Sequence, residues 1–138
     1  MVEVEPGIRH RAGYGNLLVR HPGLINCLLR RGVPPDAAVA LELEHEFGHL
    51  QSLPLVLGYG ATLYPVIFRL HSLGVLDIFL ALLSAYAAWE ICAELHVIWH
   101  SPGRYIASYR GVSPAPRWIF WSCALALALV AWLPLLLV

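Results

Sequence analysis

The residues of this chain that are best suited to chemistry form one short motif, His45-Glu46-Phe47-Gly48-His49. Residues four apart share one face of an α-helix, so the two imidazoles can chelate a single metal ion. Glu46 lies next to the first histidine and can act as general base toward a water that the metal activates. The pattern HExxH therefore predicts a helix that carries a catalytic zinc site.

A catalytic zinc ion needs a third protein ligand as well as an open position. Two carboxylates, Glu90 and Glu94, interrupt the otherwise apolar stretch AYAAWEICAELHVIW. Placing a carboxylate in a membrane-embedded segment costs free energy, and such carboxylates usually have a function. They are also four residues apart, and so they lie on one helical face. Each of them can supply the third ligand.

An antiparallel pair of helices would bring these groups to the histidines. If the chain turns near His71, His49 lies 22 residues before the turn and Glu90 lies 19 residues after it. At about 1.5 Å per residue, these are descents of about 33 and 28 Å. The proline and glycine residues of the first helix can absorb this difference. The spacing therefore predicts that Glu90 lies within about one helical turn of His49 in height.

The composition indicates that a membrane is the second solvent of this chain. Of its 138 residues, 59% are hydrophobic and 13% are charged, and the mean hydropathy is +0.66. A water-soluble domain of this size could not easily bury so much apolar surface. The net charge of zero argues against nucleic acid as a partner. Three widely spaced cysteines argue against a disulfide framework, and we expect no signal peptide.

Three apolar segments predict an all-α membrane protein with about three transmembrane helices and a single membrane-embedded domain. The last segment carries no charge over 21 residues, and the first is either a kinked span or a continuation of the helix before it. An amphipathic helix with the HExxH motif and a short strand at Asn16–Arg20 precede them. The predicted parts are a cytoplasmic or interfacial part (1–52), a helical hairpin (53–99), a cytoplasmic loop (100–117) and a C-terminal transmembrane helix (118–138).

The arginines predict the orientation in the membrane. Five precede the first apolar segment, three lie between the second and third, and one lies between the first and second. By the positive-inside rule, the N-terminal part and the loop 100–117 face the cytoplasm. We therefore expect a multi-pass protein of the cytoplasmic membrane whose active site faces the cytoplasm.

The motif HEFGH followed by EICAE (residues 90–94) resembles the gluzincin pattern HExxH…ExxxD, with glutamate in place of the aspartate. The upstream stretch NLLVRHPGLINCLLRRGVPPDAAVALELEHEFGH is similar to the HtpX and CAAX-prenyl-protease type of integral-membrane metallopeptidase, and to the peptidases of antibiotic-sensing receptors. The resemblance covers about residues 14–96. It implies that the zinc ligands are His45, His49 and Glu90, that the base is Glu46, and that Glu94 orients a ligand histidine.

The resemblance also implies a zinc metalloendopeptidase that acts on peptide or membrane-protein segments at the cytoplasmic membrane interface, with the lipid bilayer as a further partner. Family members are usually about twice this length or more, so assembly of several copies into a homo-oligomer stays open. The strand at Asn16–Arg20 could pair with extended substrate by strand addition. No residue that stabilises the transition state carries over by motif; the available side chains are His100, Arg104, Tyr105 and Tyr109.

Two other functions compete with this interpretation. A metal-binding membrane scaffold or regulator without catalysis would use the same histidines, but it would not need Glu46 as a base. A di-metal carboxylate oxidase would use the spacings Glu42-x-x-His45 and Glu46-x-x-His49. Such bundles carry their ExxH units on different helices, whereas both units lie on one predicted helix here.

Overall fold

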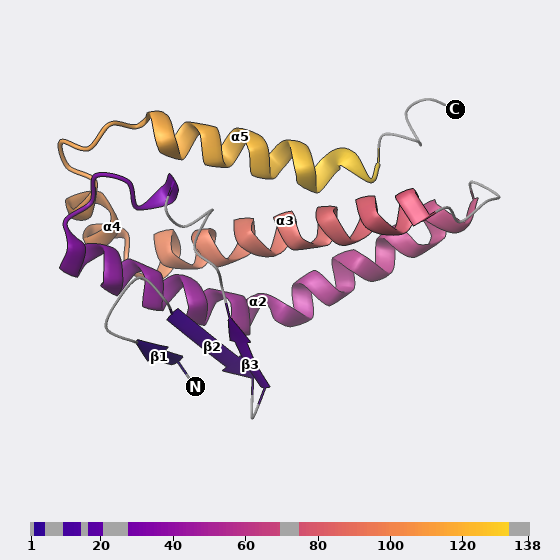
Figure 1. Cartoon of the computed structure of the whole chain (residues 1–138), viewed down its shortest axis with the longest axis horizontal. Helices are drawn as coiled ribbons and strands as arrows, with labels where there is room; N and C mark the ends of the chain where they lie inside the picture. The colour runs from indigo at the N-terminus through magenta and orange to yellow at the C-terminus, as the bar shows by residue number, and fades with distance from the viewer. Residues whose placement is uncertain (1, 5–9, 15–16, 21–27, 70–74, 133–138) are drawn as a thin grey trace.

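The computed structural model describes residues 2–4, 10–14, 17–20, 28–69 and 75–132, and the side chains of 28–63 and 75–132 (Figure 1). This part of the chain is mainly α-helical. Its four helices are α2 (Pro35–Arg69), α3 (Val75–His100), α4 (Pro102–Ser108) and α5 (Ala115–Val130). A small antiparallel sheet has the order β1-β2-β3, with β1 at Val2–Val4, β2 at His10–Tyr14 and β3 at Leu17–Arg20.

Helix α3 lies between α2 and α5 and packs against both of them (Figure 1). It runs antiparallel to α2, so the C-terminal end of α3 lies beside the N-terminal half of α2. The short helix α4 and the start of α5 lie at this same end of the molecule, and the sheet lies against α2. One end of the bundle therefore gathers the HExxH motif and the two α3 carboxylates.

The HExxH helix and the first apolar segment form one helix of 35 residues, about 52 Å long. Pro35 suits the first turn because its fixed φ is helical and its missing N–H would have no partner there. Pro54 and Pro65 lie inside α2 and do not end it. The first apolar segment is therefore continuous with the helix before it, which is one of the two arrangements expected, and its passage through a membrane stays a prediction.

One helix of the described residues, α3, is long and apolar enough to cross a membrane, and α5 is a shorter apolar helix. At 16 residues, α5 extends over about 24 Å, less than the bilayer core of about 30 Å. The predicted third span continued to residue 138, and residues 133–138 lie outside the described part. The three-span, multi-pass arrangement therefore stays a prediction.

Strand β3 lies within the segment Asn16–Arg20, where a strand was expected. Most of the helix predicted for His21–Arg31 lies outside the described residues. Its expected stop, Gly32, has a φ of +84°, a left-handed conformation that favours glycine and ends a helical turn. The predicted cytoplasmic loop 100–117 contains α4, which begins at Pro102 for the same reason that α2 begins at Pro35.

Candidate metal centre

The glycine of the HExxH motif allows α2 and α3 to approach each other closely. A Cβ atom built on Gly48 would lie 2.7 Å from the carbonyl oxygen of Ala93 and 2.9 Å from its Cα. These distances are shorter than real Cβ contacts, so only glycine fits at this crossing point. Ala93 lies between Glu90 and Glu94 on α3. The contact therefore sets how near both carboxylates come to the histidines.

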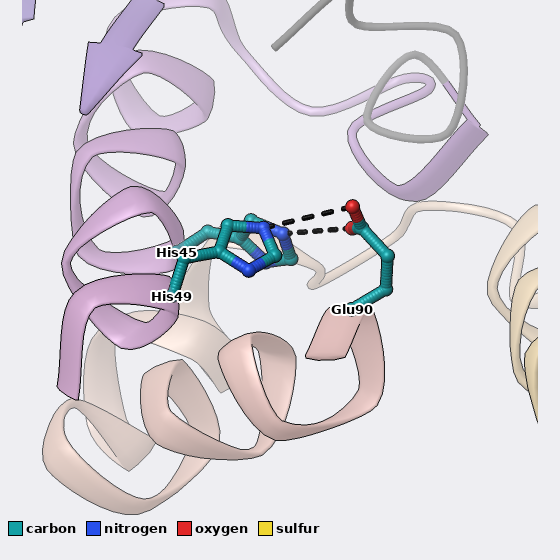
Figure 2. A group of neighbouring side chains, drawn as sticks. All are labelled: His45, His49 and Glu90. Atoms are coloured by element: carbon teal, nitrogen blue, oxygen red, sulfur yellow. Dashed lines mark hydrogen bonds and ion pairs between the residues drawn. The ribbon is translucent and has the colours of Figure 1, made fainter. Parts of the chain in front are cut away.

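Two histidines and one carboxylate meet across this contact (Figure 2). The Nε2 atom of His45 lies 3.2 Å from Oε2 of Glu90, and Nε2 of His49 lies 3.6 Å from Oε1 of Glu90. One ligand atom from each residue lies within 4.8 Å of the others, and all three side chains are buried. The structure therefore brings together the three residues that the sequence predicted as ligands.

This donor set fits a zinc ion. Two ligand atoms about 2.1 Å from one tetrahedral zinc ion lie about 3.4 Å apart. The two histidine–carboxylate distances, 3.2 and 3.6 Å, end on different oxygens of Glu90, and the ligand atoms of the group lie within 4.8 Å of one another, so a bound ion would draw them closer together. Two imidazoles with one glutamate form a recognised ligand set of catalytic zinc sites.

Glu94 contacts the other side of the first histidine. Its Oε2 atom lies 3.0 Å from Nδ1 of His45. A proton on Nδ1 would be donated to this carboxylate, which leaves the lone pair of Nε2 directed toward Glu90. Within the described residues, Glu94 does not join the group that can hold a metal. The choice between Glu90 and Glu94 as third ligand therefore favours Glu90 by geometry.

Glu46 is fully buried in α2 between the two histidines of the motif. Burial raises the pKa of Glu46 to about 8, although the neighbouring His45 opposes this shift. Burial also lowers the pKa of His45, but its hydrogen bonds to Glu90 and Glu94 outweigh that effect and raise the pKa to about 9. Several titratable groups therefore lie close together in this site, and solvent hardly reaches them.

Residues that the motif did not reveal complete the surroundings. The indole of Trp89 donates a hydrogen bond to the carbonyl oxygen of His49 at 2.8 Å, and its ring contacts the His49 ring edge-on. Arg30 forms two hydrogen bonds with Glu94. In the sequence, Trp89 is one residue of the apolar stretch around Glu90, and Arg30 is one of the arginines that predict the orientation. No spacing links either residue to the HExxH motif, so the sequence held no signal for these contacts.

The other polar residues that the sequence offered lie around the site. Arg104 and Ser101 both donate hydrogen bonds to Glu44, and Glu42 lies 3.5 Å from Arg30. His96 and His100 contact each other, with ring centroids 4.1 Å apart. In the described part, the group able to hold a metal contains none of these residues. Among the described residues, the structure therefore does not show the second group of metal ligands that a di-metal oxidase requires.

Comparisons of the chain with protein-family models, with curated proteins and with solved structures find no match. The case for a metal centre therefore rests on the residues and distances given above.

Proposed function

We propose that this chain is a zinc-dependent membrane metallopeptidase that hydrolyses peptide bonds at the cytoplasmic membrane interface. The observation that carries the proposal is the convergence of His45, His49 and Glu90, from two helices, beside the buried glutamate of an HExxH motif. A bound zinc ion would polarise the scissile carbonyl and make a water molecule more acidic.

The side chains of this site then have distinct tasks. Glu46 accepts the proton of the attacking water on its carboxylate and passes it to the leaving amine. Burial raises the pKa of Glu46 in the metal-free site, and a cation held beside it would favour the ionised carboxylate that a general base needs. Glu94 accepts a hydrogen bond from Nδ1 of His45 and so keeps Nε2 of that ring available as a ligand.

The surface of α3 supports a location in the membrane. Leu76, Phe79 and Leu82 each expose more than half of their side chains, which is unfavourable in water and favourable in lipid. The metal centre lies in the half of α3 toward the opposite end, where α4, which carries Arg104, and the start of α5 also lie (Figure 1). Because arginines favour the cytoplasmic side, we infer that the site works at that interface. Peptides or membrane-protein segments would be the substrates, and an assembly of several copies would be one way to complete their binding site.

Metal analysis of the purified full chain in detergent tests the first half of the proposal. We expect about one zinc ion per chain in the natural protein, loss of zinc in Glu90→Ala, and weakened binding in Glu94→Ala. No zinc in the natural protein would refute the proposal. Two iron ions per chain would instead support a di-metal oxidase.

The second half concerns catalysis, and it has one competitor. Every member of the group, with Glu46, is at most 2% exposed, and structural zinc sites are closed in this way. A metal-binding scaffold is therefore the alternative function. Hydrolysis of an unfolded protein, followed by mass spectrometry of new amino termini, separates the two. We expect cleavage by the natural protein and loss of cleavage in Glu46→Gln with zinc retained, whereas a scaffold would cleave nothing.

A further inference from the structure

Arg30 is a buried cation for which the proposed chemistry has no direct use. It lies in the turn before α2 and is 8% exposed. Its Nη1 atom lies 2.8 Å from Oε1 of Glu94 and its Nη2 atom lies 2.7 Å from Oε2, so the guanidinium holds both oxygens. A buried charge is costly unless it is paired and hydrogen-bonded. Burying the charge of Arg30 beside the metal centre costs free energy, so its contacts at that centre need a physical reason.

Glu94 connects Arg30 to the metal ligand. The same oxygen that accepts from Nη2 of Arg30 lies 3.0 Å from Nδ1 of His45. A glutamate side chain has three rotatable bonds, and a single contact with an imidazole leaves much of that freedom in place. The planar, two-pronged contact with an arginine fixes both the position and the plane of the carboxylate.

A second partner fixes Arg30 itself. Its Nη1 atom donates a hydrogen bond to the hydroxyl of Tyr109 at 2.7 Å, and that hydroxyl donates to the carbonyl oxygen of Leu29 at 2.7 Å. The guanidinium of Arg117 lies over the Tyr109 ring, 4.3 Å from its centre. The arginine is therefore held from the segment between α4 and α5 as well as from α3.

We propose that Arg30 is a positioning residue of the metal centre, which acts through Glu94 to fix the orientation of the His45 ring. This inference rests on the proposed function, because it needs a metal that His45 binds. It adds a residue 15 positions before the motif to the determinants of metal affinity. Partners that orient a ligand histidine in this way typically change metal affinity by about 10–100-fold when they are removed.

The test measures metal binding and not catalysis. The full chain in detergent is titrated with zinc against a chromophoric chelator, and its cobalt-substituted form gives an absorption spectrum that reports ligand geometry. For Arg30→Gln we expect zinc affinity to fall by about tenfold or more, with a changed cobalt spectrum. Arg30→Lys keeps the charge but not the two-pronged contact, so an intermediate loss is expected. The matched control is Arg31→Gln, an exposed neighbour that should bind zinc like the natural protein.

A double variant separates positioning from a general effect on folding. If Arg30 acts through Glu94, Arg30→Gln should cause no further loss of zinc affinity in a Glu94→Gln protein. Additive losses would overturn the inference, since they would mean that the two residues act independently. If Arg30→Gln does not fold, Arg30→Lys and Tyr109→Phe carry the test, and unchanged affinity in both overturns it.

Failure of this inference and failure of the proposed function look different. A natural protein that binds one zinc ion, together with an Arg30→Gln variant that binds it equally well, overturns the positioning role alone. A natural protein that binds no zinc overturns both.

Discussion

Replacement of Gly48 by alanine is the sharpest test of how this site is built. The new Cβ would lie 2.7 Å from the carbonyl oxygen of Ala93, and it would also lie 2.9 Å from Cβ of His96. The first of these atoms belongs to the backbone of α3, which cannot rotate away. Ordinary contact begins at about 3.4 Å, so α3 must retreat from α2 by about 0.7 Å.

This movement of α3 would separate the metal ligands of the two helices. Ala93 lies one turn or less from Glu90, so the carboxylate moves with it. The distance between Nε2 of His45 and Glu90, now 3.2 Å, would grow to about 3.9 Å and exceed the separation of about 3.4 Å that one zinc ion imposes on two ligands. Overpacking costs about 1–3 kcal/mol, and the better helix propensity of alanine returns about 1 kcal/mol. We expect a net loss of up to about 2 kcal/mol and a fall of at least about tenfold in zinc affinity.

The assay is chelator competition for zinc together with the thermal midpoint of the metal-free chain, both in detergent. Gly58→Ala is the matched control, because nothing lies within 4 Å of a Cβ at that position of the same helix. It should gain up to about 1 kcal/mol of stability from helix propensity and should bind zinc normally. The reasoning is refuted if Gly48→Ala matches Gly58→Ala in both stability and zinc affinity.

Three further predictions concern other polar groups of the bundle. The hydroxyl of Ser84 in α3 donates a hydrogen bond to the carbonyl oxygen of Ala128 in α5, and the hydroxyl of Tyr59 donates to the same oxygen. Because that oxygen keeps one donor in Ser84→Ala, thermal unfolding should show a loss of stability of only about 0.5–1.5 kcal/mol. A larger loss would contradict this. Arg104→Gln breaks an ion pair with Glu44 whose arginine is half exposed, and denaturation should show a loss below about 1 kcal/mol that shrinks further in high salt. Burial raises the pKa of Glu46 from 4.5 to about 8; the stability that its retained proton provides is complete below pH 4.5 and is lost as the pH rises through 8. The thermal midpoint of the metal-free chain should therefore fall between pH 6 and pH 9, and less so in Glu46→Gln; equal falls would argue against the buried carboxyl as the cause.

The sequence determined those features that depend on local periodicity. Two histidines four residues apart must share a helical face, and the same holds for Glu90 and Glu94. The rise per residue of a helix is constant, so counting from the turn placed Glu90 near the height of His49 before any contact was known. These inferences needed only the spacing along the chain.

Tertiary structure decided which carboxylate faces the histidines. Height along a helix follows from counting, but the rotation of α3 about its axis depends on side-chain packing, here on the contact between Gly48 and Ala93. With this rotation, Glu90 meets both Nε2 atoms and Glu94 meets Nδ1 of His45. Neither helix could specify that result alone.

The partner of Glu94 also came only from the tertiary structure. Arg30 lies 64 residues away in the chain, and in the sequence it is one of several arginines near the predicted membrane surface. The long helix α2 likewise continues past Pro54 and Pro65, where local propensity would place a break. For Arg30, the deciding interaction joins segments far apart in the chain, and its free energy is absent from any local pattern of residues.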